Sequence, residues 1–171
     1  CAQPRSARRR QLRRLGMAAS AAAWWFYHIE HTSLDAAIAP LIEKCLERKW
    51  RVLVVGREDT LARLDRALWT FRDDSFLPHG RARTDASKHP VLLSTEPHSA
   101  NNAKVALLLD GSDADAAQFE RVMVVFDGGD EAARAKARQQ YKAATDGGGK
   151  ARYFQQERAG GWKEFQGKAE A

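Results

Sequence analysis

Four side chains near the carboxyl end of the sequence have types and spacing that could bind a negatively charged group. Residues 130–145 have a helical pattern, which places on one face Arg134, Arg138, Tyr141 and Lys142, at positions i, i+4, i+7 and i+8. Arginine offers a planar fork suited to carboxylate or phosphate, lysine adds a point charge, and tyrosine adds an apolar wall. Such a face suits a short acidic peptide that ends in an apolar residue and a free carboxylate. Taken alone, the same helix is more simply interpreted as a solvated amphipathic helix.

The two strand-to-helix turns where a nucleotide phosphate would bind lack the glycines that such binding needs. The first turn, HIEHTSLD, contains no glycine, and the second has Gly56 followed by an arginine and two carboxylates. Neither resembles the dinucleotide fingerprint or the P-loop. The GGGK stretch at 147–150 precedes an alanine and follows a helical pattern, so it predicts a helix C-cap. We therefore expect no nucleotide-binding loop and no cofactor.

The histidines and cysteines form no complete catalytic or metal-binding set. His28 and His31 are spaced like half of a metal site, but no matching ligand pair completes it. There is no G-x-S-x-G elbow, and Cys45 lies on the apolar face of a helical pattern, which predicts an inert buried thiol. The sequence thus predicts no catalytic residue and no metal ligand. An α/β enzyme of unknown substrate, using the crevice at the carboxyl ends of the strands, remains the alternative.

The net charge of +6 comes from one end of the sequence. Six arginines lie within residues 1–14, and without them the chain has 22 basic and 22 acidic residues. A nearly neutral body argues against a domain built mainly to hold phosphate backbones. We expect residues 1–20 to be a disordered basic leader; a nucleic-acid-binding arm, a targeting segment and a natural start at Met17 are the open interpretations.

Neither a membrane span nor a disulfide framework is indicated. The longest apolar run falls well short of the roughly 20 residues that a spanning helix needs. The two cysteines lie far apart, at positions 1 and 45. A cytoplasmic protein without a membrane partner is therefore expected.

Apolar periodicity predicts strands that alternate with helices. Strand patterns are expected at 24–29, 51–55, 91–94, 105–109 and 122–126, and helical patterns at 34–49, 59–69, 114–119 and 130–145. Pro40 predicts a kink or a late start for the first helix, and residues 80–88 look like a polar loop. After the last helix, Tyr153 and Phe154 form a strand-like centre before a turn at 160–161. The pattern predicts one α/β domain over residues 24–165, with a mostly parallel sheet and helices on both faces, and a disordered tail at 166–171.

Two motifs at a fixed separation are the most specific feature of the sequence. RLD-x-ALW at 63–69 is followed by SF-x-PH at 75–79, and RVLV at 51–54 precedes both. Residues 26–27 (FY), Trp162 and the Arg138/Tyr141/Lys142 pattern are consistent with the same family. Over residues 26–162 the chain resembles the chi subunit family of bacterial DNA polymerase III. The Gly-Gly pair at 128–129 and the tail after Gly149 depart from the pattern of the best-known members.

The resemblance implies a Rossmann-like, three-layer fold without a nucleotide site, and a non-catalytic role in DNA replication. Members of this family join the clamp-loader end of the replicase, in some bacteria through a small psi subunit. They also hold the acidic carboxyl-terminal tail of the single-stranded-DNA-binding protein. The chain would then be an accessory subunit of a DNA-directed DNA polymerase complex that contacts DNA mostly through this partner.

The resemblance also implies two groups of site residues. The family's tail-binding arginine matches Arg138, which would act with Arg134, Tyr141 and Lys142. The aromatics on the surface that the family uses for protein partners match Trp69 and Phe76.

Overall fold

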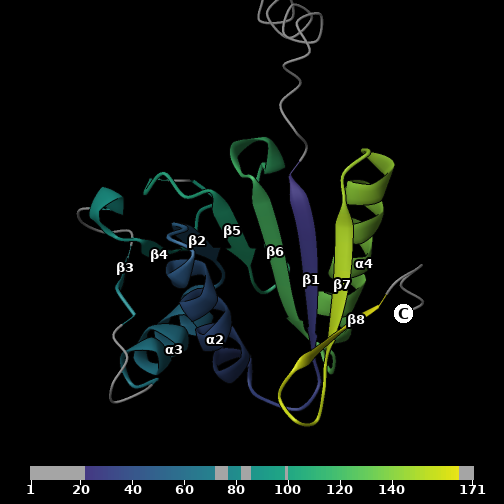
Figure 1. Ribbon diagram of the computed structural model, residues 1–171, viewed down its shortest axis with the longest axis horizontal. Coiled ribbons are helices and arrows are strands. Elements are labelled where there is room, and N and C mark those ends of the chain that lie inside the picture. The colour runs from purple at the N-terminus through teal and green to yellow at the C-terminus, as the bar shows by residue number, and fades with distance from the viewer. Residues whose placement is uncertain (1–21, 72–76, 82–85, 99, 166–171) are drawn as a thin grey trace, which may run out of the picture.

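The computed structural model describes residues 22–71, 77–81, 86–98 and 100–165 (Figure 1). Its elements, in chain order, are β1 (Ala23–Ile29), α2 (Leu34–Glu47), β2 (Val52–Val55), α3 (Glu58–Trp69), β3 (His79–Arg81), the 3₁₀ turn η1 (Ala86–Lys88), β4 (Val91–Ser94), β5 (Val105–Leu108), the 3₁₀ turn η2 (Ala116–Gln118), β6 (Arg121–Asp127), α4 (Glu131–Asp146), β7 (Ala151–Gln156) and β8 (Trp162–Phe165). The predicted leader with Met17, the predicted tail 166–171 and Phe76 lie outside the described residues.

The described strands form one sheet in the order β3-β4-β2-β5-β6-β1-β7-β8 (Figure 1). All neighbouring strands run parallel except β7 and β8, which form an antiparallel hairpin at one edge. The first strand of the chain, β1, therefore pairs with two strands from the second half of the sequence. The hairpin and β3 lie at opposite edges of the sheet.

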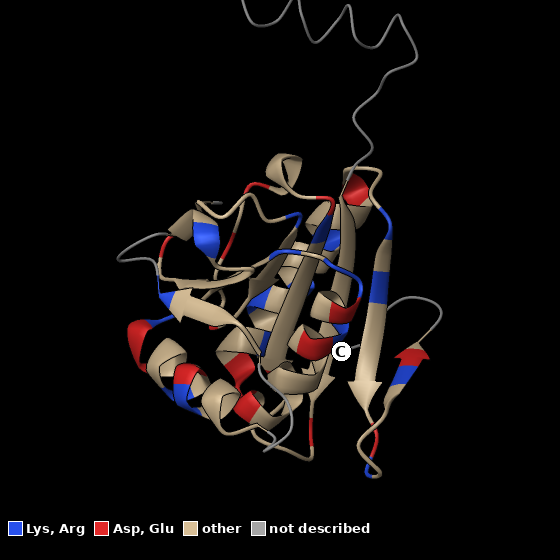
Figure 2. Cartoon of the chain, turned by 60° about the vertical axis from the view of Figure 1, so that its left-hand side comes forward, with Lys and Arg blue, Asp and Glu red and all other residues tan. Residues whose placement is uncertain are grey.

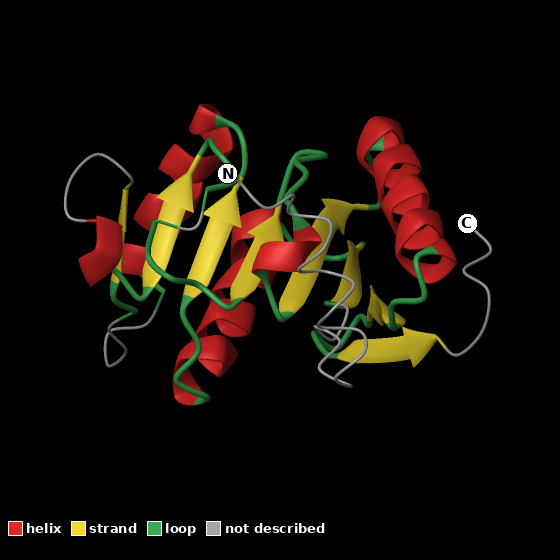
Figure 3. Cartoon of the chain, turned by 90° about the horizontal axis from the view of Figure 1, so that it is seen from above, coloured by secondary structure: helices red, strands yellow, loops and turns green. Residues whose placement is uncertain are grey.

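Helices α2 and α3 pack on one face of the sheet and α4 packs on the other (Figure 3). Because side chains alternate along a strand, Trp25, Tyr27 and Ile29 of β1 lie in the core beneath α2 and α3, whereas Phe26 lies beneath α4. The central strand β2, with the sequence VLVV, is buried along its whole length, as expected for a parallel strand covered on both faces. These observations confirm the predicted three-layer α/β fold. Among the described helices, none is long and apolar enough to cross a membrane.

Two local predictions are wrong, and one alternative is excluded. The segment expected to be a loop over 80–88 begins with β3, which pairs with β4, and ends in a 3₁₀ turn. The late start that Pro40 allowed is excluded, because Ser33 Oγ accepts a hydrogen bond from Ala36 N at 3.2 Å and the helix begins at Leu34, as its apolar pattern predicts. The helix expected over 114–119 is a single 3₁₀ turn.

Residues of the RLD-x-ALW motif meet His79, the last residue of the SF-x-PH motif, where α3 packs against β3. His79 is buried, and its Nδ1 lies 2.6 Å from the Leu77 carbonyl oxygen. Its Nε2 lies 2.9 Å from Asp65 Oδ1, and the Trp69 ring lies 4.8 Å from the imidazole, centroid to centroid. These contacts attach the end of α3 to the edge strand, so residues from both motifs are needed to build one structural junction.

Candidate functional site

The two flanks of α4 are used differently. On one flank, Lys136 Nζ lies 2.5 Å from Asp113 Oδ2, and Gln140 Nε2 donates to Asp113 Oδ1 and to the Ser112 carbonyl, at 2.7 and 3.0 Å. Burial raises the pKa of Asp113, but the hydrogen bonds from Lys136 and Gln140 outweigh it and leave the pKa lowered. This flank is thus fixed to the connection between β5 and β6.

The opposite flank carries Arg134, Arg138 and Lys142, which we call the cationic flank. Among the residues that the structure describes, none of the three has an ion-pair partner. Arg138 and Lys142 are exposed and Arg134 is half-buried. The helical spacing therefore placed these three side chains together, as predicted.

Tyr141 has a different position from the three cations. Its ring lies 5.4 Å from that of Phe26, in an edge-on arrangement beneath the helix. It is half-buried, so it connects the cationic flank to the core while leaving part of its side chain accessible. The predicted apolar wall is therefore partly a packing residue.

The cationic flank faces the β7–β8 side of the sheet. Lys136 and Gln140 contact the β5–β6 connection, and β7 lies on the other side of β6 and β1. Burial raises the pKa of the Tyr153 phenol in β7, and the positive charges of Arg134 and Arg138 oppose that shift, so both guanidinium groups lie near this tyrosine. Tyr153 therefore lies beside the candidate site, although nothing in the sequence indicated it.

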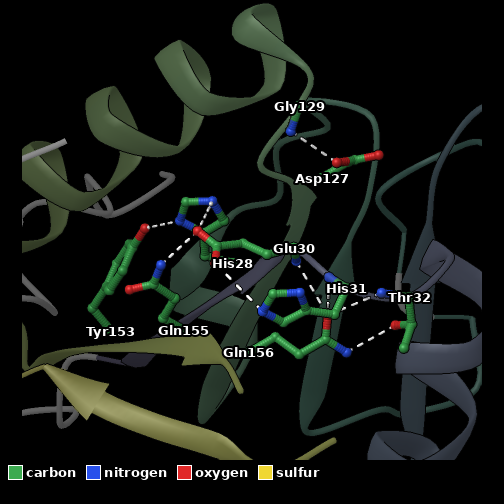
Figure 4. Close-up of polar contacts among 9 residues, drawn as sticks. All are labelled: His28, Glu30, His31, Thr32, Asp127, Gly129, Tyr153, Gln155 and Gln156. Atoms are coloured by element: carbon green, nitrogen blue, oxygen red, sulfur yellow. Dashed lines mark hydrogen bonds and ion pairs between the residues drawn. The ribbon is translucent and has the colours of Figure 1, made fainter. Parts of the chain in front are cut away.

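His28, at the end of β1, lies between Tyr153 of β7 and Glu30 (Figure 4). Its Nδ1 lies 2.5 Å from the Tyr153 hydroxyl and its Nε2 lies 3.5 Å from Glu30 Oε1. Burial lowers the pKa of His28, Glu30 raises it and Arg134 lowers it. The imidazole fills the space beside Gly128, where a Cβ atom would overlap its Nε2 and lie 3.0 Å from the Ile29 carbonyl oxygen. The Gly-Gly pair thus makes room for His28.

His28 and His31 form no metal centre with other described residues. In the described part of the chain no group of three or more histidine, cysteine or carboxylate side chains could hold a metal ion. Cys45 is buried, and this burial raises the pKa of its thiol to about 11. A thiol of that kind is a poor nucleophile at neutral pH.

The turn between β1 and α2 is filled by a side chain of the protein itself (Figure 4). The backbone N–H groups of residues 30, 31 and 32 all donate to Gln156 Oε1, at 3.1, 2.8 and 3.2 Å. Gln156 Nε2 in turn donates to Thr32 Oγ1 at 2.8 Å. Converging backbone amides of this kind are what a phosphate would use in a nucleotide-binding α/β domain. Here a buried amide oxygen already accepts their hydrogen bonds.

The turn between β2 and α3 is filled in the same way. Arg57 N, at the start of α3, donates to Asp110 Oδ2 at 3.0 Å. Gly56 approaches the same carboxylate, so that a Cβ there would lie 3.2 Å from Asp110 Oδ2. A carboxylate at this helix N-terminus satisfies the exposed amide and repels a second anion.

The candidate partner surface at the other edge of the sheet is described only in part. Trp69 is 57% exposed, which is unusual for so large an apolar side chain. Phe76, the other aromatic assigned to this surface, lies outside the described residues. Across the body, basic and acidic residues are interspersed (Figure 2), in agreement with its near-neutral charge.

The fold and these turns define a class of protein: a three-layer α/β domain in which two typical phosphate-binding positions are filled by its own side chains. The family described as DNA polymerase III chi subunit, HolC, matches residues 22–152, and the chain belongs to this family. It is 28% identical over 89 residues to a protein of Rickettsia prowazekii (strain Madrid E) named probable DNA polymerase III subunit chi. That alignment covers 51% of this chain and 54% of the relative, so the chain spans about half the length of the curated relative it matches.

Proposed function

We propose that this chain links the clamp-loader end of DNA polymerase III to single-stranded DNA through the single-stranded-DNA-binding protein. In this proposal the cationic flank of α4 binds the acidic carboxyl-terminal tail of that protein. The chain itself is non-catalytic, acts in DNA replication at the replisome and contacts DNA mostly through its partner. The other end of the tether is a clamp-loader subunit, reached directly or through a psi subunit.

One observation carries the tail-binding part of the proposal. α4 has a cation fixed by a carboxylate on one flank, Lys136 with Asp113, and three cations without ion-pair partners among the described residues on the other. Unpaired, accessible guanidinium groups are ready to form charge-assisted hydrogen bonds with an incoming carboxylate. Because these groups are solvated before binding, the affinity should be modest and should fall as salt is added.

The clamp-loader part of the proposal concerns Trp69. It is exposed at the end of α3, and its ring lies against the buried His79 that joins α3 to β3. An aromatic side chain held in this way loses little conformational freedom on binding a partner. With Phe76 it would form the surface for a clamp-loader subunit. The Trp69→Ala chain should recover less of the clamp-loader subunits from cell extract than the unchanged chain does, with tail binding intact.

The rival function, an α/β enzyme that uses the crevice at the strand carboxyl ends, is disfavoured by two contacts. Gln156 Oε1 accepts from the amides of one turn, and Asp110 accepts from the amide of the next. A saturable signal on titration with nucleotides would support the rival function and contradict ours.

The tail-binding proposal is tested by titrating a fluorescent peptide that has several acidic residues and a terminal phenylalanine carboxylate. Hydrogen bonds to charged groups contribute about 1.5–3 kcal/mol, so Arg138→Ala should weaken binding by roughly 10- to 100-fold. The matched control is Lys136→Ala, which removes one cation from the same helix on the flank that is already paired. It should bind almost as tightly as the unchanged chain.

Two further measurements test the chemistry of the contact. A peptide with an amidated carboxyl terminus should bind more weakly than the free acid, because one of the charged groups is lost. Affinity should decrease between low and physiological salt. If Arg138→Ala and Lys136→Ala bind equally well, the cationic flank is not the site.

A further inference from the structure

The β7–β8 hairpin presents an exposed aromatic surface beside the cationic flank. In the antiparallel pairing, Tyr153 lies opposite Phe165 and Gln155 lies opposite Lys163. Directly paired residues share a face of the sheet, and Tyr153 packs in the core on the α4 side. Phe165 therefore lies on the same side as α4, and it is 44% exposed.

The hairpin is held firmly from its other face. Arg152 and Glu164 form a bidentate pair, with Nε–Oε1 and Nη2–Oε2 distances of 2.7 and 2.6 Å. The Trp162 ring packs edge-on against Tyr27 at 5.1 Å, and Gln156 is bound in the β1–α2 turn. These contacts attach the hairpin to β1 and to the β1–α2 turn.

The exposed ring of Phe165 is linked to the cationic flank through Tyr153. Phe165 packs edge-on to Tyr153 at 6.2 Å, and Lys163 Nζ lies 5.8 Å from the centre of the Phe165 ring. The Tyr153 phenol lies within the field of Arg134 and Arg138. α4 packs against β6, β1 and β7, whereas β8 lies beyond β7 at the edge of the sheet (Figure 3).

We infer that the β7–β8 hairpin forms the second wall of the peptide site, with Phe165 and Tyr153 taking the terminal apolar side chain of an acidic peptide. Arg134 and Arg138 then hold carboxylates along the helix, and Lys163 adds a cation on the hairpin side. The occupant follows from complementarity, since the surface joins apolar rings to cations that lack partners among the described residues. This inference rests on the proposed tail binding and adds the residues that select the apolar end of the peptide.

The wall lies mostly outside the part of the chain that matches the chi family. The match ends at residue 152, whereas the hairpin continues to Phe165. Its contribution therefore cannot be inferred from family membership and has to be measured on this chain.

The test is a double-mutant cycle between protein and peptide, read by fluorescence anisotropy. Two peptides are compared, one ending in Phe and one with this residue replaced by Ala, against the unchanged chain and Phe165→Ala. An aromatic contact contributes enough for a loss of about tenfold. Phe165→Ala should lose this factor with the Phe peptide and almost none with the Ala peptide.

Separate variants distinguish the outcomes. Lys163→Ala should weaken binding of both peptides alike, whereas the control Arg158→Ala, which removes a cation from the hairpin turn, should not. If Arg138→Ala weakens binding while Phe165→Ala leaves the affinity for both peptides unchanged, the second wall is wrong and the proposed function stands. If Arg138→Ala has no effect, both fail.

Alternative occupants of the same surface give their own signals. A concentration-dependent dimer in sedimentation that disappears in Phe165→Ala would assign the surface to a second copy of the chain and overturn the inference. Thermal unfolding of Phe165→Ala close to that of the unchanged chain establishes that a lost affinity is not lost folding, as expected for so exposed a side chain.

Discussion

The guanidinium of Arg121 lies between two tryptophan rings, and we expect this sandwich to contribute measurably to the free energy of unfolding. Its Cζ is 3.8 Å from the centre of the Trp25 ring and 4.4 Å from that of Trp50. Arg121 Nε and Nη1 are buried and have no hydrogen-bond partner among the described residues. Burial lowers the pKa of Arg121, which marks a desolvation cost that the attraction to the rings has to exceed.

The magnitude follows from the two ring contacts. A cation–π contact contributes about 0.5–1 kcal/mol at an exposed site and about 2 kcal/mol when desolvated. After the desolvation cost, Arg121→Met should lower the free energy of unfolding by about 1–2 kcal/mol, or Tm by about 2–8 °C. Arg48→Met provides a matched control, because Arg48 is exposed and its Cζ lies farther from the centre of the Trp50 ring, at 5.0 Å. It should lower the free energy of unfolding by about 0.5 kcal/mol, the lower end of the range for an exposed contact.

The assay is urea denaturation followed by tryptophan fluorescence and far-UV circular dichroism. Arg121→Met and Trp50→Leu are measured singly and together, and the coupling energy should be about 1 kcal/mol. A coupling energy near zero would mean that the rings do not stabilise the cation. A more stable Arg121→Met protein would mean that the cost of burying the charge exceeds the attraction.

Three further predictions concern the contacts at the carboxyl end of β1. Gly128→Ala should lower the free energy of unfolding by about 1–3 kcal/mol, because the added methyl overlaps the His28 ring. The control Gly129→Ala should change it little, because its Cβ would meet only one carboxylate oxygen, at 3.4 Å. Equal urea midpoints for the two variants would contradict this prediction. Since the pKa of His28 is lowered in the folded state, its contribution to stability is complete above pH about 6.5 and is lost as the pH falls. His28→Gln should therefore reduce the difference between the urea midpoints at pH 7.5 and pH 5.5. An unchanged difference would mean that His28 is not the group responsible for this pH dependence. Gln156→Leu should lower the free energy of unfolding by about 2–4 kcal/mol, because it leaves the amides of the β1–α2 turn unsatisfied. In the same denaturation assay, Gln155→Leu should lower it by less than about 1 kcal/mol, because only one exposed hydrogen bond to Glu30 is removed.

The central strands could be predicted from sequence because burial on both faces demands continuous apolar runs. VLVV, VLLS and VALL have such runs, and each forms a strand within a residue of its expected ends. The edge strand HGR has no such run. It forms a strand because it pairs with β4 and because its His79 is buried. The sequence pattern does not predict β8 for a similar reason, because a strand of alternating half-buried and exposed residues gives little apolar signal in so short a run.

The cationic flank could be predicted because helical spacing alone brings Arg134, Arg138 and Lys142 together. The other members of the site depend on strand order, which local patterns do not contain. Tyr153 reaches His28 across 125 positions of sequence, and Gln156 reaches the β1–α2 turn across a similar separation. In the sequence, Gln156 belongs to a polar run, QQER, that carries no sign of a buried, specific contact.

The position of β1 in the sheet has a consequence for how the chain folds during synthesis. β1 is among the most aromatic segments of the sequence, AWWFYHI, and among the described strands its two neighbours are β6 and β7. About ninety residues separate it from β6, so at usual rates of translation it waits roughly 5–20 s for its first partner strand. During that time its backbone edges and tryptophans are exposed, a state that favours aggregation or capture by a chaperone. Nascent chains stalled before residue 121 should therefore be retained by chaperones, and release should coincide with the emergence of β6.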